Sequence, residues 1–92
     1  MIEGLVDQIE QRHAELERLM GDPDVLGDRR RAAEVGREYH QMETAARLAA
    51  QWRHARSDEE GFKELLDVGE DVREVLDAAR AERERLEEEI RL

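Results

Sequence analysis

The sequence predicts an all-α fold, an elongated antiparallel three-helix bundle that resembles a coiled coil and has a long central helix. Charged residues make up 43% of the 92 residues, whereas only three side chains are aromatic. This composition leaves too little bulky apolar material for a closed catalytic pocket. Apolar residues instead recur every three to four positions, which is typical of helices that bury one stripe.

Charge is distributed unevenly along the chain, and the pattern favours a basic central helix between two acidic ones. Residues 1–28 hold two arginines against eight acids, a net charge of −6. Residues 29–57 hold seven arginines against three acids, a net charge of +4. Residues 58–92 hold six bases against fourteen acids, a net charge of −8. Electrostatic attraction is therefore expected along both helix–helix contacts.

The first helix is expected over residues 2–20. Its helical spacing is kept by Ile2, Leu5, Ile9, Leu16 and Leu19. Gly21 predicts a left-handed end to this helix, and residues 21–28 predict a loop. Asp28 is expected to cap the next helix through its carboxylate, with Asp24 as the alternative cap.

The central helix is expected over residues 28–66, because the apolar spacing continues there with one change of phase. Such a change lets a long helix pass its buried face from one partner helix to another. A break at residues 57–61, with Ser57 capping a new helix, is the alternative. Gly69 predicts the second turn, and the third helix is expected over residues 70–91. The whole chain is expected to form a single helical domain.

The sequence lacks the residue patterns of catalytic and metal sites. The only serine, Ser57, lies beside His54 and Asp58, but three neighbours on one helix surface provide no oxyanion hole. His13 and His40 complete the histidines, none of which has the spacing of a zinc site, and there is no cysteine. We therefore expect no enzymatic activity, no cofactor and no metal.

Two features are candidate interaction sites. Seven arginines of the central helix either pair with acids of the first helix or stay free to contact RNA. They are Arg29, Arg30, Arg31, Arg37, Arg47, Arg53 and Arg56. The first four of them are the candidate interaction residues. Trp52 either packs between helices or forms a docking patch for a partner. The net charge of −10 argues against independent nucleic-acid binding. No apolar run is long enough to cross a membrane, so no membrane partner is expected.

Several stretches resemble the N-terminal domain of the peptide chain release factor 1 family. Residues 13–26, HAELERLMGDPDVL, resemble the family's opening H-x-E-L-E-x-L-L-S-D-P-E-V. Residues 37–39 resemble its K/R-E-Y motif, and residues 64–67 its E-L-L-x-D motif. Trp52 stands where some members carry an aromatic residue, and residues 86–92 resemble the approach to the family's Leu-rich strand. Release factor 2 has a related domain.

The resemblance spans essentially the whole chain and implies a role in translation termination. Complete members of the family act in the cytoplasm, where they recognise UAA and UAG codons and trigger peptidyl-tRNA hydrolysis on the ribosome. Their codon-reading Pro-x-Thr motif and their Gly-Gly-Gln motif do not occur in this sequence. The chain is therefore expected to be a non-catalytic positioning fragment of a longer factor, with the large-subunit stalk-base region of the ribosome as its partner.

The alternative is a free-standing helical hairpin that binds other proteins, such as a chaperone-like coiled coil. A tRNA-binding arm like that of seryl-tRNA synthetase fits the acidic outer helices less well. Apolar stripes that are left uncovered at the helix ends also leave room for a homodimer of the isolated chain.

Overall fold

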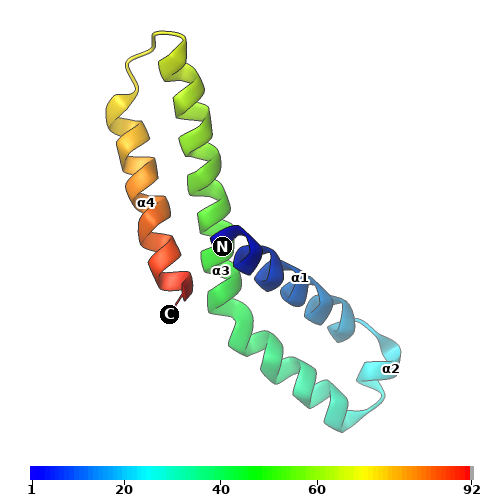
Figure 1. The fold of residues 1–92 in the computed structure, drawn as a ribbon. Coiled ribbons are helices and arrows are strands. Elements are labelled where there is room, and N and C mark those ends of the chain that lie inside the picture. The colour runs from blue at the N-terminus through cyan, green and yellow to red at the C-terminus, as the bar shows by residue number, and fades with distance from the viewer. Residues whose placement is uncertain (92) are drawn as a thin grey trace. The chain divides into compact units, whose positions relative to one another are not determined.

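A computed structural model of the chain describes residues 1–91, which form four helices and no strand. The predicted all-α class with one long helix is confirmed (Figure 1). The chain divides into two compact units, Met1–Arg47 and a second unit that begins at Leu48. The long helix α3, Arg29–Asp67, contributes its first part to one unit and its second part to the other.

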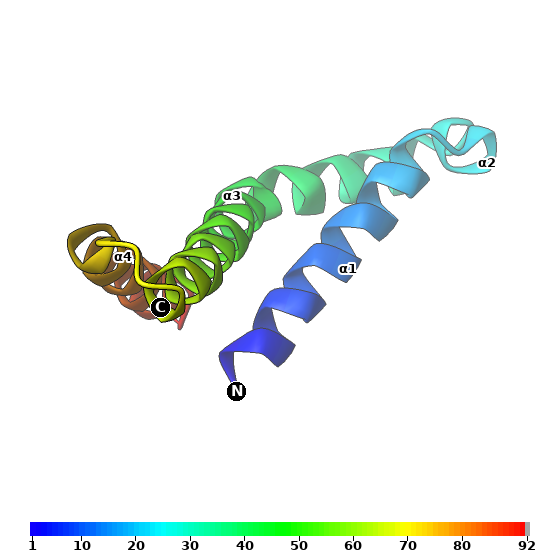
Figure 2. The ribbon, with the colours of Figure 1, turned by 90° about the horizontal axis from the view of Figure 1, so that it is seen from above.

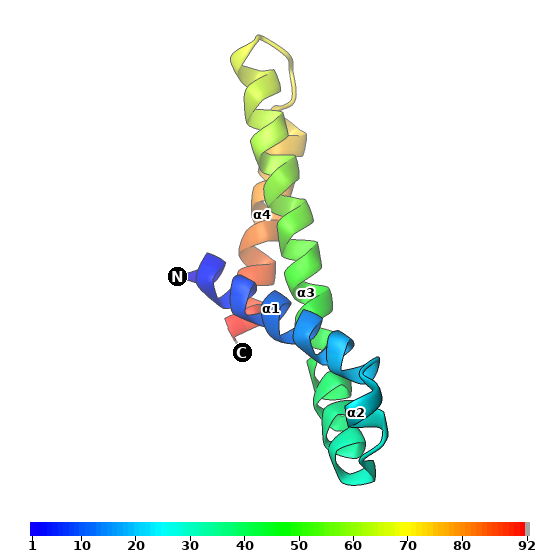
Figure 3. The same ribbon diagram turned by 90° about the vertical axis from the view of Figure 1, so that its right-hand side faces the viewer.

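In the first unit, helix α1, Ile2–Met20, runs antiparallel to the beginning of α3 (Figures 1 and 3). Its bounds match the range predicted for the first helix. Leu16 is fully buried, as its place in the apolar stripe predicts. His13 stacks on Tyr39 of α3, with ring centroids 5.1 Å apart. These contacts hold the N-terminal helical hairpin together.

The loop predicted over residues 21–28 is wrong in part, because a short helix, α2, occupies Pro23–Leu26 (Figure 3). It is an addition to the three helices that the sequence predicts. The side chain of Asp22 caps α2 by accepting a hydrogen bond from the backbone N–H of Asp24, 2.9 Å away. Proline suits the first helical position because its fixed φ and missing N–H cost nothing there. Val25 is fully buried and anchors the short helix.

Helix α3 begins one residue later than predicted, and Asp28 caps it as expected. The backbone N–H of Arg31 donates to the carboxylate of Asp28 at 3.2 Å. Asp24 does not cap α3, because it lies within α2. The alternative break at residues 57–61 is also wrong, since the helix continues without interruption to Asp67.

The two turn glycines adopt different conformations. Gly21 ends α1 with a φ of −99°, so the left-handed conformation predicted there is wrong. Its N–H still reaches the carbonyl of Arg18, as at the end of a helix. Gly69 has a φ of +91°, which favours glycine over residues with a side chain.

In the second unit, helix α4, Arg73–Arg91, runs antiparallel to the rest of α3 (Figures 1 and 2). It begins three residues later than the predicted start at residue 70. The N–H of Glu70 donates to the carbonyl of Leu65 at 3.0 Å, and the N–H of Val72 to the carbonyl of Glu70 at 3.1 Å. These bonds belong to the turn, so the acids before Val72 lie ahead of the helix.

The core of the second unit contains small and aliphatic side chains around one tryptophan. Trp52 is 1% exposed and Leu86 is fully buried. Leu76, which is buried, faces the core, whereas the neighbouring Val75 is exposed. Among residues 1–91, no helix combines the length and the apolar character that a membrane span requires.

Replacing Leu16 by alanine is expected to destabilise the first unit by about 2–5 kcal/mol, because a fully buried side chain leaves a cavity. The matched control is Leu26→Ala, whose side chain is 60% exposed and whose loss should change stability little. Neutralising Arg30 should likewise lower the stability less than replacing Leu16 does. Urea titrations followed by circular dichroism measure the three effects. A larger loss from Arg30 or Leu26 than from Leu16 would contradict this packing.

Candidate functional site

The cationic candidates lie at the start of α3, and all four are exposed. Arg29, Arg30 and Arg31 form the first turn of the helix, and Arg37 follows two turns later. The side chain of Arg30 is 91% exposed and makes only a local ion pair, 3.3 Å long, with Glu34 of the same helix.

The other three guanidinium groups of this set, those of Arg29, Arg31 and Arg37, have no hydrogen-bond or ion-pair partner among the described residues. Pairing with acids of α1, one of the two interpretations of the sequence, is therefore not seen for these arginines. We call the four arginines the cationic surface.

One ion pair between α1 and α3 has the opposite polarity to that expected from the charge blocks. Arg12 of the acidic helix α1 donates two hydrogen bonds to Glu38 of the basic helix α3, the longer of them 2.7 Å. The hydrogen bonds from Arg12 lower the pKa of the Glu38 carboxyl. Tyr39, one residue later, donates from its hydroxyl to Glu17 of α1 at 3.3 Å. The polar contacts of this hairpin thus use side chains other than the cationic surface.

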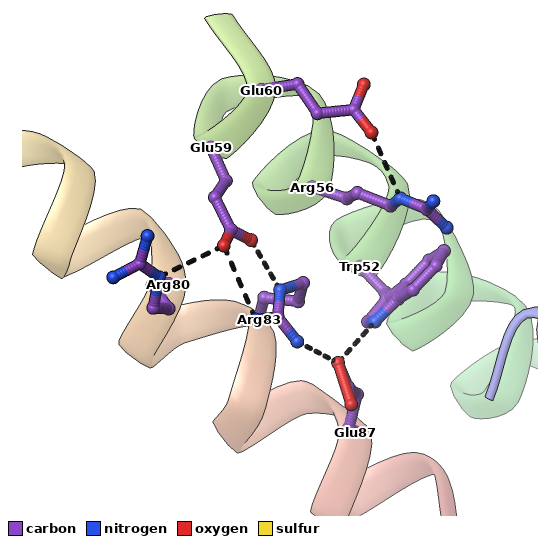
Figure 4. A network of polar contacts seen from close by, with 7 residues as sticks. All are labelled: Trp52, Arg56, Glu59, Glu60, Arg80, Arg83 and Glu87. Carbon is purple, nitrogen blue, oxygen red and sulfur yellow. Dashed lines mark hydrogen bonds and ion pairs between the residues drawn. The ribbon is translucent and has the colours of Figure 1, made fainter. Parts of the chain in front are cut away.

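Trp52 lies in the core of the second unit, where its indole packs rather than faces solvent. Its Nε1–H donates to Glu87 of α4 at 3.2 Å (Figure 4). The guanidinium groups of Arg53 and Arg56 lie 5.5 and 5.2 Å from the indole ring, within the range of cation–π attraction. This placement supports the packing interpretation of Trp52.

Glu87 and Trp52 belong to a network of ionic contacts that joins α3 to α4 (Figure 4). Its centre is Glu59, a carboxylate of α3 that is only 6% exposed. Arg80 donates to Glu59 at 3.2 Å, and Arg83 donates to it at 2.5 Å. Arg83 also donates to Glu87 at 2.6 Å, so one guanidinium bridges two carboxylates.

The network keeps its groups charged. Hydrogen bonds from Arg83 lower the pKa of Glu59 by more than burial raises it. Burial of Glu87 opposes ionisation, but hydrogen bonds from Arg83 and Trp52 outweigh it and lower the pKa of this carboxyl. The two carboxylates in turn raise the pKa of Arg83. Since each buried polar atom of the described residues has a partner, the network offers no free base or nucleophile. It aligns α4 on α3.

Sequence reasoning missed this network, although one signal for it was present. Glu59 occupies a position of the apolar stripe, seven residues after Trp52 and three before Phe62. A carboxylate in such a position requires a charged or hydrogen-bonding partner. The partners, Arg80 and Arg83, are 21 and 24 residues away, so spacing within one helix does not reveal them.

The histidines lie apart from one another. His13 stacks on Tyr39, and His40 lies 3.7 Å from Glu43 on its own helix. His54 is exposed on α3. Within residues 1–91, no group of three or more histidine, aspartate and glutamate side chains is arranged to hold a metal ion.

Replacing Glu59 by glutamine is expected to destabilise the second unit by about 1–3 kcal/mol at neutral pH, because two guanidinium groups lose their charged acceptor. The folded-state pKa of Glu59 lies below its unfolded value of about 4.3. The contribution of this carboxylate is therefore complete above about pH 5 and is lost as the pH falls below about 4. Unfolding titrations of both proteins should show a difference in stability at pH 7 that narrows progressively as the pH falls below about 4.

The matched control is Glu82→Gln, which removes an exposed carboxylate that pairs with Arg85 on the same helix. Water screens such a pair, so stability should change little. An equal loss from both variants, or a stability difference that does not narrow as the pH falls below about 4, would contradict the structural role of Glu59.

Comparison with known proteins identifies the family of the chain. The PCRF domain, a domain of class I peptide chain release factors, matches residues 9–92. No solved structure matches the chain. The match begins within α1 and covers the turn at α2, all of α3 and the described part of α4. This chain therefore belongs to the PCRF domain family of class I peptide chain release factors.

Proposed function

We propose that this chain is the non-catalytic positioning domain of a cytoplasmic factor that resembles release factor 1 and ends translation at UAA and UAG codons. The family match over residues 9–92 is the observation that carries the proposal. The motif residues 13–26, which most resemble factor 1, form the end of α1, the turn and α2. In this proposal the chain is a single helical domain and one part of a longer factor.

The positioning role is supported by the way the polar side chains are used. The buried carboxylate Glu59 is fully engaged in holding α4, so it is not available for proton transfer. Codon reading and peptide release belong to motifs that the sequence does not contain. In our proposal Trp52 contributes indirectly, because it fixes α4 through Glu87.

The cationic surface is the part of the domain that we propose to face ribosomal RNA near the stalk base. Arg29, Arg30 and Arg31 occupy the first turn of α3, where the positive end of the helix dipole disfavours cations by a few tenths of a kcal/mol each. Arg30 makes one local pair, and the other two have no partner within the described chain. The stability of the fold therefore does not account for the three arginines at the start of α3, whereas binding to phosphate groups does.

Replacing Arg29, Arg30 and Arg31 together by glutamine is expected to weaken ribosome binding. The slope of log affinity against log salt should fall by about one for each arginine that contacts a phosphate. Sedimentation of the protein with ribosomes over a range of salt concentrations measures both effects. The triple variant should also retain its helix content, since the three exposed guanidinium groups make no hydrogen bond or ion pair with another helix among the described residues.

The matched control removes the same charge elsewhere, through glutamine at Lys63, Arg73 and Arg91. These three cations are exposed in the second unit, so ribosome binding and its salt dependence should change less. Equal losses from the two triple variants would mean that net charge, and not the cationic surface, governs binding.

The isolated chain is expected to be helical and to give no peptide release, because hydrolysis needs the missing Gly-Gly-Gln motif. Release is measured as free peptide from ribosomes that hold UAA, UAG or UGA in the decoding site. The natural protein that carries this chain should act at UAA and UAG. Release by the isolated chain would overturn the non-catalytic role. Action of the natural protein at UGA in place of UAG would instead indicate factor 2.

A further inference from the structure

The turn between α3 and α4 exposes apolar side chains that the fold does not use. Val68 is 76% exposed, Val75 is 46% exposed and Leu65 is 43% exposed. Leu65 lies in the last turn of α3, Val68 in the turn itself and Val75 in the first turn of α4. Figure 1 draws this turn in yellow between α3 and α4. We call residues 64–77 the turn surface. Exposed apolar groups that gather in one place are typical of interaction sites.

The turn surface is also strongly acidic, with six acids and a single arginine, Arg73. Its acids are Glu64, Asp67, Glu70, Asp71, Glu74 and Asp77. None of the six carboxylates has an ion pair or a side-chain hydrogen bond with another described residue. Elsewhere in the same unit, Glu59 and Glu82 are paired with arginines. The charges of the turn surface are therefore not compensated within the fold.

A pocket joins the apolar and the acidic parts of this surface. It has a volume of about 270 Å³ and is lined by Asp71, Val72, Glu74 and Val75. Two valine side chains offer apolar contact, and two carboxylates lie beside them. A bulky aliphatic side chain with a lysine or arginine next to it matches this lining.

We propose that the turn surface docks a basic segment of a partner protein, whose aliphatic side chain enters the pocket and whose cations pair with the surrounding carboxylates. The charge of the surface decides among the classes of partner. Phosphate groups of RNA would meet unpaired carboxylates and be repelled. A second copy of the same surface would bring like charges together. The inference goes beyond the proposed function, because it rests on the turn surface alone.

The experiment uses the complete chain, labelled with ¹⁵N, and a synthetic amphipathic helix of lysine and leucine as the probe. Amide shifts should change at residues 64–77 more than elsewhere, and added salt should weaken the binding. A peptide of equal length made of glutamate and leucine should not bind there. Polyuridylate, the RNA probe, should also leave these amides unchanged.

Two sets of variants test the chemistry. Asp71→Asn with Glu74→Gln should weaken binding of the basic peptide about fivefold, whereas Asp58→Asn with Glu84→Gln, which removes the same charge from exposed helical positions, should not. Val68→Ser with Val75→Ser should also weaken it. The matched apolar control is Leu26→Ser in the first unit, which should have no effect.

Three outcomes would overturn the inference. They are peptide-induced shifts that centre on the acidic stretch 82–89 of α4, equal losses from the test and control variants, and binding of polyuridylate or of the glutamate peptide at the turn surface. None of these outcomes affects ribosome binding through the cationic surface, so the two proposals can fail separately.

Discussion

The structure depends on how little apolar surface each helix contributes. Helix α1 fully buries only Val6 and Leu16, and the buried residues of α4 are Leu76, Ala79 and Leu86. In proteins most of the stability of a helix comes from packing of its apolar face, so α1 and α4 rely on their contacts with α3. Few apolar side chains define how the helices align. Polar contacts between the helices therefore contribute more to their alignment. In the second unit the network around Glu59 provides this alignment.

A buried ion pair is not in itself a source of stability, because desolvation offsets much of the electrostatic attraction. A buried ion pair has a clearer effect on how two helices align with each other. Glu59 stands in the apolar stripe of α3, so a shift of α4 by one turn would remove one of the two arginines that contact its buried carboxylate. The same shift would separate Trp52 from Glu87. Since the loss of a hydrogen-bond partner from a buried charge is destabilising, the observed register is favoured over its neighbours.

The sequence predicted the long helices well and the short-range details less well. The bounds of α1 and α3 follow from apolar spacing and, for α3, from the cap at Asp28, signals that extend over many residues. Helix α2 has four residues, too few to show a period. Asp71 was expected in the first turn of α4, but the backbone bonds of the turn extend to Val72. The ionic network joins residues up to 35 positions apart, which local spacing rules do not reach.

Local spacing rules also fail to predict the ion pairs of the candidate site. The net charges of residues 1–28, 29–57 and 58–92 predicted attraction between helices but not which side chains would pair. Arg12 and Glu38 each differ in sign from their own block, and they form an ion pair between α1 and α3. Among residues 1–91, the arginines at the start of α3 make no ion pair or hydrogen bond through their guanidinium groups with α1, and the acids around Gly69 make none through their carboxylates. Charges that are paired within a helical hairpin define its register, whereas unpaired charges remain available to partners. The cationic surface attracts phosphate groups, whereas the acidic turn surface repels them. In our proposals the two surfaces therefore bind partners of opposite charge, which suits a domain that positions a larger factor.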